Sequence, residues 1–393
     1  MNLERYKQIS QRDYEAIAGP DWPSFADFQL HESVASFVYK EIDEMLTGPR
    51  PFNNNAFCVL PFYAKEFPRG SPCCYLADKY NLEEIKLDML AGRRSTSCQK
   101  CWNLEDAGIK SNRQLNNETL DFYFDKDLAT VFELCQQGKD EILHYKIATS
   151  NTCNSLCITC SSGSSSAWGQ LERRNGVVPA TNWTLEIDSV ADDINFAQAK
   201  SFGFLGGEPL LSAANFKILE RLIEHGNTDC FINFQTNGSV ELSQRQKDIL
   251  EHFTNINMSF SIDGIGPVFE YLRYPLKWDS VLENIEYCRS HGMMVSACYT
   301  VSNLNLLYHK ETCAWFDKND IRYFVNLVYD PPHFRIGALP QQVKEQLPKL
   351  DHQPHTEQDD LDYGVFRRKI AEQDAWKGIK MQDYLPKLHQ LLG

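Results

Sequence analysis

From residue 141 onward, short apolar runs alternate with amphipathic segments, and this alternation limits the fold more than any other feature of the chain. Segments with helical spacing, such as "NFKILERLIEHG", separate the apolar runs. The runs are "ILHYKIATS", "SFGFLGG", "CFINFQTNG", "INMSFSIDG", "MMVSACYTV" and "IRYFVNLVY". Strands that alternate with helices predict a parallel sheet with right-handed crossovers. These six units are fewer than the roughly eight of a closed barrel, so we predict an α/β fold with a partial (β/α)6 barrel over residues 141–340.

The rest of the chain differs in character from this regular part. At 393 residues the chain exceeds one ordinary core, so several domains are expected. Residues 1–50 are polar with helical spacing, and residues 341–393 form a second polar segment that we predict to be a helical tail. Residues 51–140 are rich in Pro, Gly, aromatic residues and cysteines. Such segments are commonly held together by metal, so we predict a separate metal-binding domain there.

Composition excludes several classes of protein. No run of eighteen apolar residues occurs, which argues against a membrane span. The charged N-terminus does not resemble a signal peptide, and thirteen cysteines without one indicate a reducing, cytoplasmic location. The formal net charge of −14 opposes extended contacts with nucleic-acid phosphates.

Three cysteines, Cys153, Cys157 and Cys160, directly follow the first predicted strand in "SNTCNSLCITC". Ligands of parallel α/β folds lie at the carboxyl ends of the strands, so this loop is expected in the functional site. Thiolates at short spacing hold iron–sulfur clusters, and three of them leave one iron of a cubic cluster open to an external ligand. A zinc site completed elsewhere and simple exposed thiols remain alternatives.

The next predicted strand ends in "FGFLGGEPLL", which contains Gly206, Gly207 and Glu208. Two glycines allow a ligand to approach the backbone closely, and a glutamate suits an ammonium group. Alone, this motif is an ordinary turn at least as often as a ligand site. Together with the three-cysteine loop, it resembles the radical S-adenosylmethionine (radical SAM) superfamily over residues 141–340.

This resemblance implies a 4Fe–4S cluster on Cys153, Cys157 and Cys160, with the amine and carboxylate of SAM on the fourth iron. It also implies an electron donor such as flavodoxin or ferredoxin, and a 5′-deoxyadenosyl radical that abstracts a hydrogen atom from the substrate. Thr159 departs from the family, many members of which carry an aromatic residue before the third cysteine. The positions similar to SAM contacts are Gly206, Gly207, Glu208, Thr236, Asn237, Ser261, Arg273, Asn303 and Val328.

Five cysteines are grouped between residues 58 and 101, before the barrel, and the pair Cys98-x-x-Cys101 is typical of a metal knuckle. Spacing does not separate zinc from a 4Fe–4S cluster here. The segment resembles the twitch and SPASM domains that carry auxiliary clusters, although those usually follow the barrel, and the full SPASM cysteine pattern is absent. The ligands we predict are Cys58, Cys74, Cys98 and Cys101, with Cys73 as the substitute for Cys74.

The resemblance implies a radical SAM oxidoreductase or maturase, and we expect it to modify a peptide by oxidation, crosslinking or epimerisation. One alternative is dehydrogenation of a small molecule such as an aminocyclitol or sugar. An alternative of another class is a non-enzymatic zinc protein that uses both cysteine groups structurally. Asp263, Tyr271, Tyr274 and His333 are candidates for proton transfer because they lie at or beyond predicted strand ends, and of these we select Asp263 and Tyr271. Asp263 also suits a plain turn. The remaining cysteines occur singly, which is typical of small buried hydrophobes.

Overall fold

The structure is a computed structural model that describes most of the chain after residue 51. The described residues are 52, 54–76, 79–106, 108, 110–118, 126–348 and 355–393. The helical segment predicted for residues 1–50 therefore lies outside the described residues.

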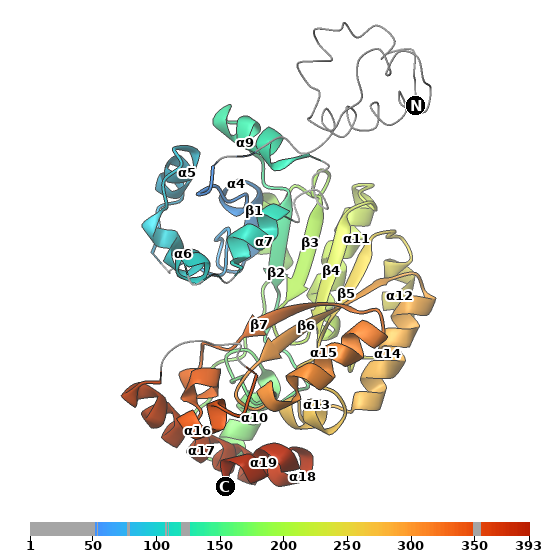
Figure 1. Ribbon diagram of the computed structural model, residues 1–393. Coiled ribbons are helices and arrows are strands. Elements are labelled where there is room, and N and C mark those ends of the chain that lie inside the picture. The colour runs from blue at the N-terminus through green and yellow to red at the C-terminus, as the bar shows by residue number, and fades with distance from the viewer. Residues whose placement is uncertain are drawn as a thin grey trace, which may run out of the picture.

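A parallel sheet of seven strands, in the order β1-β2-β3-β4-β5-β6-β7, forms the centre of the molecule (Figure 1). The sheet curves without closing, which confirms the predicted α/β class and the partial barrel. The strands are β1 (Ala64–Phe67), β2 (His144–Ala148), β3 (Ser201–Leu205), β4 (Phe231–Thr236), β5 (Ile256–Ser261), β6 (Met294–Val301) and β7 (Arg322–Leu327).

The sheet contains one strand more than the six units of the sequence, and the additional strand comes from the cysteine-rich segment. β1 pairs with β2 in parallel, with Ala64 opposite His144 and Phe67 opposite Ile147. Its sequence, "AKEF", contains two charged residues in four, so no apolar run marks it as a strand. In the fold, one of these charges is compensated across the pair, because Glu66 lies 3.7 Å from the amine of Lys146.

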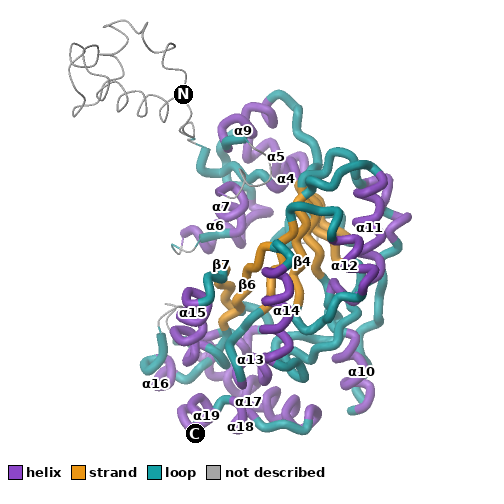
Figure 2. The backbone as a smooth tube through the Cα atoms, turned by 90° about the vertical axis from the view of Figure 1, so that its right-hand side faces the viewer, coloured by secondary structure: helices purple, strands orange, loops and turns teal. Residues whose placement is uncertain are grey.

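Helices cover the outer face of the sheet, where the aromatic residues of the strands pack against them (Figures 1 and 2). Phe234 of β4 stacks on Phe204 of β3 at 4.7 Å between ring centroids and on Phe216 of the covering helix α11 at 5.9 Å. The helices of the barrel are α10 (Ser166–Arg174), α11 (Ala213–Glu224), α12 (Gln244–Leu250), α13 (Pro267–Leu272), α14 (Trp278–Ser290) and α15 (His309–Lys318).

The inner face of the sheet is polar rather than filled with apolar side chains. Asn257 of β5 donates from its amide to Asn233 of β4 at 2.7 Å and to Ser296 of β6 at 2.9 Å. Gln235, two residues beyond Asn233 on the same strand, is exposed. Asn233, Asn257 and Ser296 are only partly buried, so this face presents polar groups that a ligand could contact.

The cysteine-rich segment has a hydrophobic core of its own, in which Phe57, Phe62, Ile85, Met89 and Val131 are buried. The side chain of Asn81 caps α5 by accepting from Glu84 N. Its helices are α4 (Leu60–Tyr63), α5 (Leu82–Leu90), α6 (Gln99–Asp106), α7 (Asn112–Glu118) and α9 (Leu128–Gln136).

The C-terminal tail is helical as predicted and packs beneath the sheet beside α10 and α13 (Figure 1). A capping box formed by Thr356 and Asp359 begins its longest helix, and Gly378 ends that helix in the left-handed conformation with φ 67°. The tail consists of α16 (Gln341–Lys344), α17 (Glu357–Lys377), α18 (Met381–Tyr384) and α19 (Pro386–Leu392). No helix of the described part of the chain has the length and apolar character needed to cross a membrane.

Candidate functional site

The loop that carries Cys153, Cys157 and Cys160 connects β2 to α10 and lies at the carboxyl edge of the sheet. All three thiols are partly buried. Two backbone bonds attach this cluster loop to the end of α13, because Leu156 N donates to Tyr274 O at 2.6 Å and Ile158 N donates to Leu272 O at 2.8 Å. The loop is therefore held against the segment that contains Arg273.

The sulfur atoms of the cluster loop have polar neighbours. The hydroxyl of Ser155 lies 3.0 Å from Cys157 Sγ, and the guanidinium of Arg273 donates to the same sulfur at 3.8 Å. Burial and, after it, the neighbouring Cys157 raise the pKa of Cys160 to about 12, whereas Arg273 opposes this shift. Cys157 raises the pKa of both Cys153 and Cys160, as a neighbouring thiol does.

Gly206 and Gly207 bring the end of β3 against the backbone of the cluster loop. Gly207 N donates to Ser150 O at 2.9 Å, and Glu208 N donates to Thr152 O at 2.7 Å. A Cβ at Gly206 would lie 2.6 Å from Ser150 O, and a Cβ at Gly207 would lie 2.6 Å from the carbonyl carbon of Thr152. The two glycines, which the sequence analysis interpreted as room for a ligand, therefore also give room to the loop itself.

The carboxylate of Glu208 joins the ends of β3 and β4. It is 1% exposed, and one oxygen accepts from Thr236 Oγ1 at 2.8 Å and from Leu210 N at 3.1 Å. The other oxygen accepts from Asn237 N at 2.7 Å. Burial raises the pKa of Glu208, and these hydrogen bonds oppose the shift. Three predicted SAM-contact residues thus form one network.

The two candidates for proton transfer lie in different surroundings. Asp263 forms an ion pair with Arg273 at 2.8 Å and accepts from Thr300 N at 3.0 Å, so it is placed beside the cluster loop with its carboxylate already engaged. Tyr271 is fully buried in the C-terminal core, and its hydroxyl donates to Asp374 of α17 at 2.9 Å. Burial and that carboxylate raise the pKa of Tyr271. The Tyr271 hydroxyl is thus bonded to Asp374, and the Asp263 carboxylate is paired with Arg273 beside the cluster loop.

Two buried polar atoms near the cluster loop have no hydrogen-bond partner among the described residues. They are Nε of Arg273 and Oδ1 of Asn303. Asn303 is fully buried, and its amide nitrogen donates to His333 O at 2.9 Å, which leaves only the oxygen free. Unpaired buried polar atoms are costly, and both residues were predicted to contact SAM. Arg273 Nε is a hydrogen-bond donor and Asn303 Oδ1 is an acceptor, so each can bind a complementary group of a ligand.

The remaining predicted SAM contacts lie at the same edge of the sheet. Ser261 ends β5 and is 8% exposed. Val328 follows β7, donates from its backbone N to Val301 O at 2.9 Å, and belongs to the hydrophobic core that contains Ile158 of the cluster loop.

The second group of cysteines surrounds a small cavity in the cysteine-rich segment. Cys73 Sγ, one of the four sulfurs that line it, accepts from Tyr75 N at 3.4 Å and from Asn112 Nδ2 at 3.5 Å. Cys74, the preferred ligand of the sequence analysis, is exposed and does not line the cavity. The cysteines that line the cavity are Cys58, Cys73, Cys98 and Cys101. The arrangement therefore favours the substitute ligand, Cys73.

Across the described residues, no three or more Cys, His, Asp or Glu side chains are grouped so as to hold a metal ion as they stand. Thiolates are nevertheless the donor set of iron–sulfur clusters, and each thiolate of a cubic cluster binds a different iron rather than one shared ion. By donor chemistry, both cysteine groups fit such clusters.

A buried ion pair between Arg113 and Glu105 lies beside the second group of cysteines. Arg113 and Glu105 are 8% and 9% exposed in their side chains and lie 2.7 Å apart. Arg113 also donates to Phe57 O at 2.8 Å, next to Cys58. Buried charges are tolerated when they are paired and hydrogen-bonded, and this pair thereby holds the Phe57 carbonyl next to Cys58.

Residues from the C-terminal tail approach the cluster loop, and nothing in the sequence indicated this. Gln373 of α17 donates to Ile158 O at 3.1 Å, and the amine of Lys377 lies 4.7 Å from the ring centre of Trp168.

A single cysteine lies on the inner face of the sheet, where Cys298 Sγ is 3.2 Å from the hydroxyl of Ser259. Its isolated position in the sequence predicted only a packing role. Only the folded chain brings these side chains to the site.

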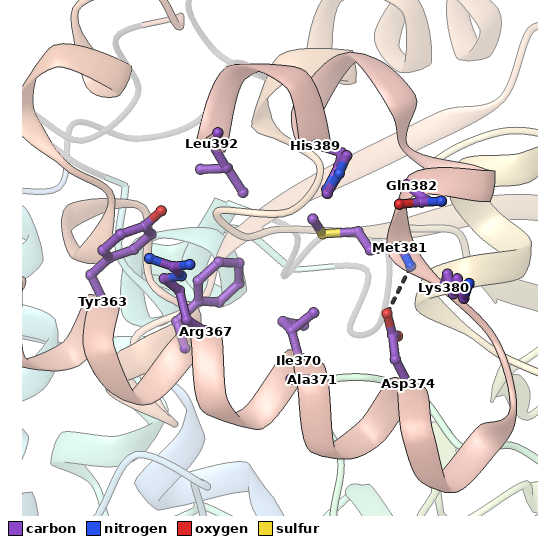
Figure 3. Close-up of a pocket in the computed structure, with 12 residues that line it drawn as sticks. Tyr363, Arg367, Ile370, Ala371, Asp374, Lys380, Met381, Gln382, His389 and Leu392 are labelled. Carbon is purple, nitrogen blue, oxygen red and sulfur yellow. Dashed lines mark hydrogen bonds between the residues drawn. The ribbon is translucent and has the colours of Figure 1, made fainter.

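A cavity of about 280 Å³ lies between α17, α18 and α19 (Figure 3). Its walls combine apolar side chains such as Ile370 and Met381 with the polar groups of Arg367 and His389. Asp374 projects from α17 toward the cavity and accepts from Met381 N at 2.7 Å. None of the predicted site residues lines it.

Comparison with protein families identifies the central part of the chain. The family model described as the Radical SAM superfamily matches residues 147–313, so this segment is similar to radical SAM domains. The match includes the cluster loop and strands β3 to β6, and it covers less than half of the chain. No curated protein matched the sequence.

Several solved structures resemble the fold at low identity. "Native anSMEcpe with bound AdoMet" is 16% identical over 60% of this chain and 63% of its own, with a TM-score of 0.39. Streptococcus suis SuiB bound to its precursor peptide SuiA is 14% identical over 91% and 65%, with a TM-score of 0.37. Methylornithine synthase (PylB) is 11% identical over 72% and 76%, with a TM-score of 0.36. This chain spans less than two thirds of the length of the first two.

Proposed function

We propose that the protein is a radical SAM enzyme in which Cys153, Cys157 and Cys160 hold a 4Fe–4S cluster that leaves one iron for SAM. When bound, the cluster supplies one electron that splits SAM into methionine and a 5′-deoxyadenosyl radical, which takes a hydrogen atom from the substrate. One observation carries this proposal: three partly buried cysteines share the single loop after β2, inside the segment that the Radical SAM family model matches.

The chain's own residues would position SAM in three ways. The free Nε of Arg273 and Oδ1 of Asn303 are available to a carboxylate and a hydroxyl group. The Glu208 carboxylate accepts hydrogen bonds from Thr236 and Asn237 and so fixes these two residues at the strand ends. Glu208 would therefore position the SAM-contact residues without itself needing to contact SAM. Gly206, Gly207, Ser261 and Val328 would form the walls around it.

We propose an auxiliary 4Fe–4S cluster on Cys58, Cys73, Cys98 and Cys101, in a twitch-like domain over residues 51–140. The shared cavity and the two N–H donors to Cys73 support this ligand set. Four thiolates would leave no iron open, so we expect this cluster to relay an electron or stabilise the fold rather than bind substrate.

The substrate that we propose is a peptide, and the warrant is the resemblance of the cysteine-rich segment to twitch and SPASM domains. The polar inner face of the sheet, with Asn233, Asn257 and Ser296 joined by hydrogen bonds, supports a substrate rich in polar groups. A small polar molecule such as an aminocyclitol or sugar would suit this face too and is the second candidate. A flavodoxin or ferredoxin would supply the electron in the cytoplasm.

Anaerobic reconstitution with iron and sulfide tests the proposed function. Two cubic clusters require about eight irons per chain, together with a brown colour and release of 5′-deoxyadenosine after reduction with SAM. A colourless protein that binds zinc and releases no nucleoside would contradict the proposal and favour the structural zinc protein.

Replacement of single cysteines distinguishes Cys73 from its neighbour. In the C73A variant, the auxiliary site loses the ligand that lines its cavity, so the iron content should fall by about four per chain. The C74A variant should keep its iron, because the Cys74 thiol is exposed and lies outside the cavity. The reverse result would restore Cys74 as the ligand. Iron analysis of the two reconstituted variants measures the difference.

A further inference from the structure

Helix α17 of the C-terminal tail is attached to the backbone of the cluster loop. Gln373 is 7% exposed and donates from Nε2 to Ile158 O at 3.1 Å, across 215 residues of sequence. Ile158 lies between Cys157 and Cys160 and packs in one core with Phe366 and Ile370 of α17. The helix therefore contacts the cluster loop through both its backbone and its apolar side chain.

Lys377 lies one turn beyond Gln373 on the same face of α17 and is buried, with 8% exposure. Its amine donates to Gln373 Oε1 at 3.0 Å and lies 4.7 Å from the ring centre of Trp168. Trp168 Nε1 in turn donates to Cys157 O at 2.9 Å. The amine is thus placed beside the backbone of the loop that carries the three thiols.

The charge of Lys377 has no carboxylate partner at ion-pair distance within the described residues, because its hydrogen bond goes to a neutral amide. The other cation beside the loop, Arg273, is paired with Asp263 at 2.8 Å. Burial lowers the pKa of Lys377 to about 7, and Cys157, Asp374 and Cys160 oppose this shift. A buried ammonium is costly unless a negative charge lies nearby. Two of the three opposing groups are thiols of the cluster loop.

We propose that Lys377 is a positioning residue through which the C-terminal helix places a positive charge beside the cluster loop and makes the cluster on Cys153, Cys157 and Cys160 easier to reduce. This inference rests on the proposed function. Reduction adds one negative charge to the cluster, and a nearby cation stabilises the reduced form more than the oxidised form. The reduction potential of an iron–sulfur cluster depends on the net charge around it and on its exposure to solvent. A buried ammonium group raises the local charge without increasing the solvent exposure of the cluster.

The K377M variant tests the inference through the midpoint potential of the cluster. Removal of the charge should lower the equilibrium constant for one-electron reduction about tenfold, which is about 59 mV in midpoint potential. The measurement is a redox titration of the reconstituted protein by electron paramagnetic resonance, using the signal that changes when SAM is added. K377R should stay near the wild-type value because it keeps the charge.

Lys369 provides the matched control on the same helix. Its side chain is 48% exposed and pairs with Glu372 at 2.7 Å, so K369M removes the same charge from the surface and should leave the potential unchanged. If K377M does not fold, K377Q replaces the charge by a neutral polar group, and the same shift is expected.

Two outcomes separate this inference from the proposed function. A K377M or K377Q protein with full iron and the midpoint potential of K369M would overturn the role of Lys377 and leave the proposed function standing. A wild-type protein that binds no iron would overturn the proposed function, and the inference with it.

Discussion

Replacement of Cys153, Cys157 and Cys160 together by alanine is expected to abolish the release of 5′-deoxyadenosine and to remove about four irons per chain. The three thiols are the protein ligands that we propose for the cluster, and no other cysteine lies on their loop. The auxiliary site should keep its iron, because its cavity is lined by cysteines of the separate N-terminal segment. Iron analysis and chromatography of the nucleoside after reduction with SAM measure both effects.

A second triple variant controls for the loss of thiols as such. Cys230, Cys288 and Cys313 occur singly, and their replacement by alanine should cost some stability while iron content and nucleoside release remain at the wild-type level. Nucleoside release by the Cys153, Cys157 and Cys160 variant at the wild-type rate would show that the cluster loop is not the site of SAM cleavage.

The architecture and the position of the cluster loop could be predicted from the sequence because both depend on local patterns. Apolar runs separated by helical spacing indicate a parallel sheet, and a loop after a strand must lie at its carboxyl edge. Cys153, Cys157 and Cys160 are close in the chain, so their proximity in space follows from their spacing. The family match includes that same loop.

Features that depend on tertiary contact could not be predicted in this way. Strand β1 contains two charged residues in four, so its sequence has no apolar pattern typical of a strand. Its pairing with β2 stabilises it instead. Cys73 and Cys74 are neighbours in the chain, so only the direction of each side chain decides which one lines the cavity. The contact of Gln373 with Ile158 joins residues 215 apart, for which a single sequence offers no signal.

The G207A variant is expected to lose most SAM cleavage, by about 100-fold or more, because small displacements of catalytic groups have effects of that size. A Cβ at this position would overlap Thr152 O and would lie 2.6 Å from the carbonyl carbon of Thr152 and 2.8 Å from that of Asn151. All three are backbone atoms directly before Cys153, so the end of β3 or the cluster loop must move. Gly207 does not have a positive φ, so steric overlap alone causes the effect.

Gly203, on β3 shortly before Gly207, offers a matched control. A Cβ there would lie 3.5 Å from Lys146 Cγ and 3.8 Å from Tyr145 O, which are ordinary contacts, so G203A should bind iron and cleave SAM like the wild type. The comparison of the two variants measures iron content, circular dichroism and the rate of 5′-deoxyadenosine release. Normal cleavage by G207A would mean that the cluster loop can move away from β3 without losing its ligand geometry, which would contradict the role proposed for this contact.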